Sequence, residues 1–557
     1  YLKDNVKLNA GDSLDLNIYH DGSNSYIQDS GSGALIVTAA DQCVFQKGDG
    51  SNRVLNLHTT NGTAALMHQG NQKLITSSSG VSVTGDTTAD GLIVGSGVTI
   101  GSAGIATFRS GRVDVGDSLQ NTSVGQQAGE QLTTGSANVA VGRYAMRQTT
   151  TGVYNTAVGR DSLYANTTGN NNVAVGQAAL YTATTSVYGS VAVGSYALKL
   201  NTTGTGNNAV GYEALEENTT GSNNTALGYQ ALAVNTTGDN NTALGHAALL
   251  TNTTGNQNTA LGRQALDANT TASSNSAVGF QALTANTTGN SNVAMGVRAL
   301  AANVDTNSCT AIGFDALRYN TAADNTAVGA VALDANTTGS NNTACGKGAL
   351  SANTTADNNT AVGKNALAAN TTGTQNVAVG NLALDANTTA ANNTAIGYAA
   401  LSANTTGTRL VAIGMNALVA NTTANDNVAV GNNVLDANTT GTANVAMGYN
   451  SLGANTTTSN NTALGHKALE VATGEQNTAI GSNALTSNTT ASWNTAVGYI
   501  AGRDNTTGTG MVAVGYAALV KNTTGDYNTA LGYDALGENT TADSNTAVGY
   551  LALKENT

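Results

Sequence analysis

The sequence contains no proline, and only 10% of its residues are charged and 4% aromatic. With 66 glycines, this composition is typical of stacked coils with small side chains and not of an ordinary globular core. Three cysteines, Cys43, Cys309 and Cys345, are too few and too scattered for a disulfide framework or a zinc site. No apolar run reaches transmembrane length. The net charge of −13 disfavours nucleic acid or an anionic membrane as a partner.

What the sequence does contain is one repeat, which begins at Asn121 and continues to the end of the chain. Residues 224–240 are a clean copy, NTALGYQALAVNTTGDN. There are 26 copies, and their starts are 17 residues apart with three exceptions. Self-similarity at a short fixed period is the signature of a solenoid or array. The exceptions are copy 172–189 with 18 residues, and copies 309–324 and 461–476 with 16.

We predict that each copy forms one coil of a parallel β-roll or β-solenoid. Runs of Thr, Asn and Gly disfavour a helix. The second to fourth positions predict one strand, ended by Gly; the Ala-Leu pair predicts a second; and Asn-Thr-Thr-Gly predicts the return bend. At about 4.8 Å per coil, 26 coils would make a rod of roughly 120 Å.

Several positions of the repeat carry nearly the same residue in every copy. The fifth is always Gly, which predicts a bend with positive φ or a close backbone approach, and the third is Ala in every copy but the first, which predicts a tight slot. The second and fourth positions must face away from that Ala. They are Thr or apolar in most copies, so we expect a second copy of the chain to cover them, in a homotrimer. The structural residues singled out are Gly228, Gly245, Gly262, Ala226, Ala243, Asn235 and Asn252.

The twelfth position is Asn in 22 copies, and stacking predicts a ladder of hydrogen-bonded amides. A second interpretation is glycosylation, because 19 copies read Asn-Thr-Thr. A third is a flat array of threonine rows, as in ice-binding solenoids. The candidate glycan-bearing residues are Asn166, Asn235, Asn336 and Asn438.

The sixth position is aromatic in ten copies, either as an ordinary exposed row or as a surface that stacks on sugars. The candidates for sugar stacking are Tyr229, Tyr398, Tyr449 and Tyr516. His246 and His466 occupy the same variable position, which indicates a surface site. Cys309 and Cys345 are interpreted as packing residues. No spacing indicates a catalytic residue, a metal site or a cofactor, so the sequence does not predict an enzyme.

Before the repeat, we expect an all-β module at residues 1–80 and a connecting β segment at 81–120, with the solenoid shaft at 121–557. Alternation at 14–19, the turn at Asp21-Gly22 and the run 25–27 predict a hairpin. The chain begins with Tyr1 and ends within a copy, so its ends say nothing about a signal peptide. Further strands are expected at 34–37, 54–57, 73–75, 81–83, 92–94, 98–100 and 113–115.

Two parts of the sequence resemble known families. Residues 11–27 (GDSLDLNIYHDGSNSYI), 31–35 (GSGAL) and 77–85 (SSSGVSVTG) are similar to a module common in tail-fibre-like structural proteins of marine cyanobacterial phages. The repeat resembles, more loosely, the S-V-A-I-G head repeats of YadA-like trimeric adhesins, which form trimeric left-handed β-rolls. It departs from them in its 17-residue length and its Asn-Thr-Thr bend.

These features favour a structural fibre, a phage tail fibre or other virion appendage that acts in attachment to the host cell. Its partners would be further copies of itself and a polysaccharide or receptor of the host surface, and its location the virion. One alternative is a cellular surface filament or trimeric adhesin, glycosylated on its Asn-Thr-Thr bends and located outside the cell. Another is an ice-binding solenoid.

Overall fold

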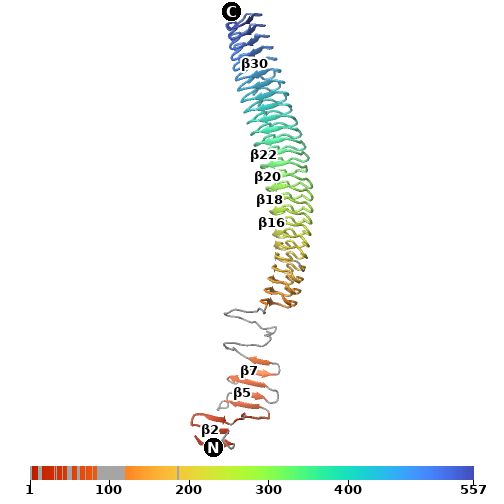
Figure 1. Ribbon diagram of the computed structural model, residues 1–557, viewed down its shortest axis with the longest axis vertical. Helices are drawn as coiled ribbons and strands as arrows, with labels where there is room; N and C mark the ends of the chain where they lie inside the picture. The colour runs from red at the N-terminus through yellow and green to blue at the C-terminus, as the bar shows by residue number, and fades with distance from the viewer. Residues whose placement is uncertain are drawn as a thin grey trace. The chain divides into compact units, whose positions relative to one another are not determined.

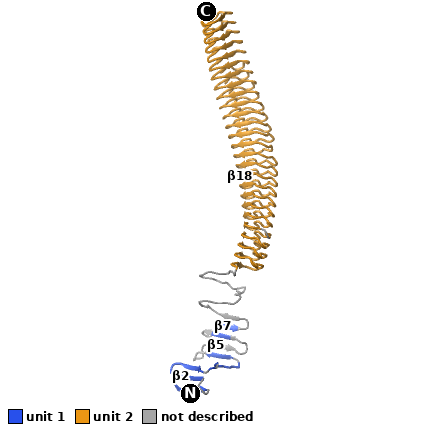
Figure 2. Ribbon diagram, in the orientation of Figure 1, with its two compact units in different colours: residues 1–112 blue, residues 113–557 orange. Residues whose placement is uncertain are grey.

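The computed structural model describes residues 3–10, 16–30, 32, 34–40, 42–46, 53–58, 63–68, 71–77, 80–83, 119–184 and 187–556. All regular structure in these residues is β, without a helix. The chain divides into two compact units, residues 1–112 and residues 113–557 (Figure 2).

The first unit begins with a three-stranded antiparallel sheet of β1 (Lys7–Ala10), β2 (Leu16–His20) and β3 (Ser25–Asp29). The predicted hairpin is therefore confirmed. Its turn is held by Asp21, whose Oδ1 accepts hydrogen bonds from the backbone N–H groups of Ser23 (2.9 Å) and Asn24 (2.7 Å).

A second antiparallel sheet follows, with five strands in sequence order. Three of the expected strands, at 54–57, 73–75 and 81–83, lie within it. The expectation at 34–37 is wrong: these residues are exposed and belong to no strand, because an apolar run forms a strand only where a neighbouring strand can take its backbone hydrogen bonds. The runs 92–94, 98–100 and 113–115 lie outside the described residues. The strands are β4 (Gln42–Gln46), β5 (Arg53–His58), β6 (Thr63–His68), β7 (Asn71–Ser77) and β8 (Gly80–Val83).

In the second unit each copy of the repeat contributes one three-residue strand, and the 26 strands form one parallel sheet. Figure 1 shows their coils stacked one upon the next. The strands are β9 (Thr122–Val124), β10 (Val139–Val141), β11 (Thr156–Val158), β12 (Val173–Val175), β13 (Val191–Val193), β14 (Asn208–Val210), β15 (Thr225–Leu227), β16 (Thr242–Leu244), β17 (Thr259–Leu261), β18 (Ser276–Val278), β19 (Val293–Met295), β20 (Thr310–Ile312), β21 (Thr326–Val328), β22 (Thr343–Cys345), β23 (Thr360–Val362), β24 (Val377–Val379), β25 (Thr394–Ile396), β26 (Val411–Ile413), β27 (Val428–Val430), β28 (Val445–Met447), β29 (Thr462–Leu464), β30 (Thr478–Ile480), β31 (Thr495–Val497), β32 (Val512–Val514), β33 (Thr529–Leu531) and β34 (Thr546–Val548).

The prediction of a β-solenoid with one coil per copy is confirmed by the strand register. Each strand pairs with the strand of the next copy at the same position of the repeat, as Ala226 does with Ala243. The register also holds across the two shortened copies, where Thr310 pairs with Thr326 and Thr462 with Thr478. The residue missing from each short copy is thus absorbed outside the strand.

The predicted second strand at Ala-Leu is wrong, because this part of the coil consists of turns. Ala231 and Leu232 are adjacent and both fully buried, whereas neighbouring residues of a strand face opposite ways. Leu232 reaches the interior with a left-handed φ of 54°, and Gln230 has a φ of 51°. The backbone N–H groups of this segment still bond along the stack, as from Leu232 to Ala248 O at 2.9 Å.

The invariant fifth-position Gly has both of the features that the sequence predicted. Its φ lies between 122° and 144° in all copies, a region that side chains rarely adopt. A Cβ built on Gly228 would also lie 2.4 Å from the carbonyl oxygen of Gly245 in the next coil. The third-position Ala is likewise buried, as at Ala226 and Ala243.

Replacing Gly228 with Val should lower the free energy of unfolding by at least about 1–3 kcal/mol, which is the cost of a side chain at this positive φ. The close contact of the new side chain with the Gly245 backbone should increase this loss. Urea unfolding measures this. Gly549→Val is the matched control, since its φ is similar (129°) but its nearest neighbour, the Ala552 Cβ, is 3.9 Å away. Equal losses at both sites would show that the close approach between coils has no energetic role.

Candidate functional site

The side chains at the second and fourth positions point away from the interior of the solenoid. We call these two rows, from β9 to β34, the outward sheet face. In β15 the pattern is exposed, buried, exposed, because Ala226 packs inside and Thr225 and Leu227 alternate with it. The exposed fraction is 45% for Leu227, 38% for Leu244 and 41% for Leu261. In a single chain, these apolar side chains are open to solvent.

This face is a long exposed surface with one apolar row and one mixed row, since its second row is Thr in 15 copies and Val in nine. Its fourth row is Val, Leu, Ile, Met or Cys345 in every copy, and its second row is Thr or Val in all but two. Three residues by 26 strands span roughly 10 Å by 120 Å, or about 1,200 Å². About half of this area, the fourth row, is apolar throughout, which matches the largest apolar patch of a typical soluble monomer, about 300–600 Å² and often functional. The outward sheet face is therefore the candidate functional site.

Cys345 belongs to this face and is exposed. Within a single chain it is therefore not the packing residue that the sequence indicated. Cys309, at a first position, is buried as predicted, and its thiol donates a hydrogen bond to the Ala322 carbonyl (3.2 Å). Burial raises the pKa of the Cys309 thiol.

The sixth-position aromatic residues stack on one another along the solenoid. Tyr516 lies between Tyr499 and Tyr533, with ring centroids 5.5 and 4.8 Å apart. Tyr229 lies between Tyr212 and His246 in the same way, at 5.4 and 5.1 Å. Both faces of these rings are occupied, and a sugar stacks on a ring face. The geometry therefore argues against sugar stacking at Tyr229 and Tyr516.

The two other candidate tyrosines are less enclosed. Tyr449 has one face against His466, with the centroids 5.6 Å apart, and Tyr398 is 53% exposed between the non-aromatic Asn381 and Met415 in its row. His246 and His466 thus lie in the surface row that the sequence predicted, stacked on tyrosines. At Tyr212 a hydrogen bond with Glu213 raises the pKa to about 12, so its hydroxyl stays protonated.

The predicted ladder of twelfth-position asparagines is present inside the coil. Nδ2 of Asn235 donates to Oδ1 of Asn218 (2.7 Å) and to the carbonyl of Gly238 (3.0 Å), and Nδ2 of Asn252 donates to Oδ1 of Asn235 (2.8 Å). Asn235 is fully buried, and both of its amide protons are donated.

This burial argues against a glycan on the Asn-Thr-Thr bends. A glycan replaces one proton of Nδ2 and needs open space around it, and the ladder leaves neither in the folded coil. The same holds at the other candidate residues, which are fully buried and whose Nδ2 groups donate to backbone carbonyls: Asn166, Asn336 and Asn438.

A second ladder, at the first position, was not predicted. Asn241 illustrates it: its Nδ2 donates to the carbonyl of Gly255 (2.8 Å), and its backbone N–H donates to Oδ1 of Asn224 (2.9 Å). The available signal was the recurrence of Asn at this position in 22 copies, the same number as at the twelfth. Together, the two ladders provide the polar part of the interior.

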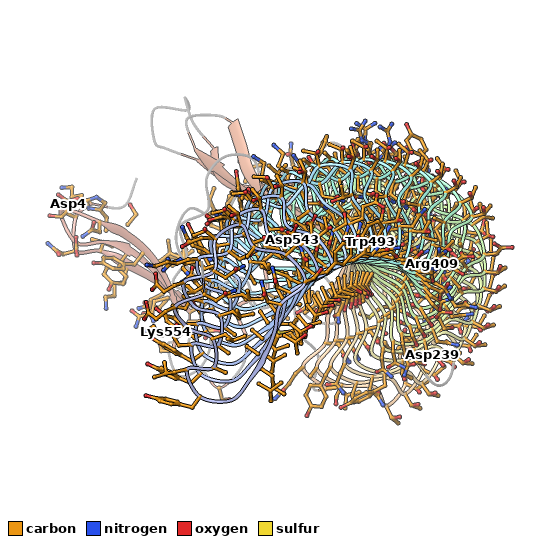
Figure 3. All side chains as sticks on the ribbon, turned by 90° about the horizontal axis from the view of Figure 1, so that it is seen from above. Asp4, Asp239, Arg409, Trp493, Asp543 and Lys554 are labelled. Atoms are coloured by element: carbon orange, nitrogen blue, oxygen red, sulfur yellow. The ribbon has the colours of Figure 1, made fainter. Side chains whose placement is uncertain are left out.

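The threonine pairs of the bend do not form the flat array of the ice-binding interpretation. The hydroxyl of Thr236 donates to the Thr253 carbonyl of the next coil (2.9 Å), so only the following threonine, such as Thr237, is exposed. Asp239 and Asp543 hold the same position of the repeat but lie in different directions from the middle of the end-on view (Figure 3). Coils far apart in the stack therefore do not superpose in this view, so the row of bend residues does not stay flat along the solenoid.

Among the described residues, no group of three or more His, Cys, Asp and Glu side chains is placed to hold a metal ion. Within the same residues, none of the regular structure is a helix long and apolar enough to cross a membrane.

Replacing Asn235 with Ala should lower the free energy of unfolding by about 1–3 kcal/mol, because the buried Asn218 Oδ1 loses its donor and the buried Asn252 Nδ2 loses an acceptor. Thermal or urea unfolding measures the change. Thr237→Ala, exposed two residues further along the bend, is the control and should have little effect. If both variants unfold alike, the amide ladder does not stabilise the coil.

A scan against models of known protein families finds no match for this chain, and neither does a search among curated proteins. The resemblances to cyanophage fibre modules and to YadA-like heads stay predictions. The function is therefore inferred from the geometry of the solenoid and its outward sheet face.

Proposed function

We propose that this chain is the shaft of a structural fibre, in which parallel copies cover one another's outward sheet faces as a homotrimer. The single observation that carries the proposal is the size of this face, about 1,200 Å² of apolar and threonine side chains. Burial of apolar surface is worth roughly 25 cal/mol per Å², so a face of this size strongly favours association.

A second copy of the chain suits this face because both have the same repeat. Adjacent strands lie about 4.8 Å apart in each, so every coil of one rod meets an equivalent coil of the other. Homo-oligomers of this kind are usually closed and cyclic, and copies that share one direction meet around a common axis. A three-fold axis along the rod brings three such narrow faces together.

The rod form favours a spacer between two attachment points. We propose that it is part of a phage tail fibre or another virion appendage and acts in attachment to a host cell through a surface polysaccharide or receptor. The resemblance of residues 11–35 to fibre modules of cyanophages supports this assignment. A solenoid held by identical contacts at each coil has the stiffness that such a spacer needs.

Leu244→Asp combined with Leu261→Asp should convert the trimer to monomers, because charged carboxylates would be buried between copies. Light scattering measures the mass, expected at three times 55.5 kDa for the unaltered protein and near 55.5 kDa for the variant. Thr254→Asp with Thr271→Asp, on the exposed bends of the same copies, is the control and should stay trimeric. A monomer mass for the unaltered protein contradicts the proposed assembly.

The assignment to a virion is tested separately, by electron microscopy with an antibody raised against residues 121–557. The antibody should label appendages of virus particles along their length. Labelling of cell-surface filaments in place of particles would contradict the virion assignment and favour the adhesin alternative.

A further inference from the structure

The two ends of each strand on the outward sheet face carry side chains of different size. After the strand comes the sixth position, which is Tyr or Phe in ten copies and Arg, Lys or His in seven. Before the strand comes the seventeenth position of the preceding copy, which is Gly, Ala, Ser or Asn in most copies. We call these the bulky flank and the recessed flank.

The side chains of the recessed flank are small because of the backbone conformation at this position. Its residues adopt a left-handed conformation throughout, with φ values such as 58° at Asn223, 62° at Ser274 and 64° at Gly510. Gly and Asn accept this conformation at the lowest cost. Small side chains are therefore favoured on this flank, and the aromatic residues of the sixth position lie on the other side of the strand.

The recessed flank also carries three aromatic residues, Tyr154, Trp493 and Tyr527, which are 63–64% exposed, and for two of them a contact along the rod is seen. The indole N–H of Trp493 donates to Oε1 of Gln476 in the preceding coil. A Cβ built on Gly510 would lie 2.8 Å from the Tyr527 ring, which shows that this ring covers Gly510. These two side chains thus contact the residue of the preceding coil in the same row.

The bulky flank is also open to a partner. The exposed fraction is 46% for Tyr229, 39% for Phe280 and 53% for Tyr398. Where the rings stack, as at Tyr229 and Tyr516, they cover one another's faces. Their edges and hydroxyl groups are then the parts that a partner can contact. Aromatic residues of this kind are enriched where proteins contact one another.

We propose that the bulky flank of one copy packs against the recessed flank of the next copy, coil for coil. This inference rests on the proposed function and adds the partner surface to it. Copies that point the same way around a common axis bring these two unlike flanks together. Copies that point in opposite directions would set aromatic row against aromatic row and leave the recessed flanks facing each other, with a gap.

Cysteine cross-linking across the two flanks tests this. The full chain carries Ser274→Cys and Phe280→Cys, in a background of Cys43→Ser and Cys345→Val. Mild oxidation by oxygen with a copper catalyst removes two protons and two electrons from each thiol pair, and an S–S bond forms. Within one chain the two sites lie on either side of β18, whose three residues alone span roughly 10 Å, beyond the Cα separation of about 7 Å that a disulfide spans.

We expect denaturing gels to show linked products up to three chains, reversed by reduction. Either cysteine alone should give no linked product, and neither should the control pair Ser274→Cys with Thr288→Cys, which moves one thiol to the exposed bend. The pair Asn392→Cys with Tyr398→Cys repeats the test seven coils away and guards against a local folding defect. Thermal unfolding of each variant checks that it is folded.

The outcomes separate the two proposals. A trimeric mass with no link across the flanks, or with links from either cysteine alone, overturns this inference and leaves the fibre assembly standing. A monomeric mass for the unaltered protein overturns both.

Discussion

The structure depends on one constraint, the stacking of each coil directly on an identical coil at about 4.8 Å. Every residue of the repeat must tolerate its own copy above and below it. The fifth-position Gly meets the next Gly backbone so closely that a Cβ has no space, as between Gly228 and Gly245. Asn at the first and twelfth positions donates and accepts along the stack, as between Asn235 and Asn218, so identical polar residues satisfy one another inside a narrow coil. Leu at the ninth position fills what remains.

The copies of unusual length support this account. The 18-residue copy has Ala183 where the amide ladder would continue, one 16-residue copy has Ala472 there, and the other begins with Cys309 in place of Asn. A ladder amide reaches a carbonyl three residues along the bend, as Asn235 reaches Gly238. Where the bend changes length this carbonyl moves. Ala183 and Ala472 replace the amide in two of the three copies, whereas in copy 309–324 Asn320 keeps the ladder by donating to Ala322, two residues along (2.6 Å), and by accepting from Asn336 (2.7 Å). The strands keep their register because the change lies outside them.

Much of this could be predicted from the sequence, because a repeat reports its own constraints. The 17-residue period predicted one coil per copy, and the invariant Gly predicted the bend. The invariant Ala predicted the tight slot, and the twelfth-position Asn predicted the amide ladder. The turns at Ala231-Leu232 could not be predicted from the sequence. No sequence pattern indicates a left-handed φ at a leucine, and two adjacent apolar residues also fit a buried strand. The first-position ladder went unrecognised because an Asn before a strand is also an ordinary turn residue. For the candidate site, the rows at the second and fourth positions were predictable from alternation. The occlusion of the Tyr229 faces and of the Asn235 amide depends on contacts between coils.

The central claim for function is that another copy covers the outward sheet face, and the thiol of Cys345 reports on it directly. This thiol is exposed in a single chain, whereas Cys309 is buried within it. In a Cys43→Ser variant, the rate of maleimide labelling should be measured on native and on urea-unfolded protein. We expect no labelling of Cys345 in the native protein and rapid labelling after unfolding. Rapid labelling of Cys345 in the native protein would show that the face is open, and would contradict the account.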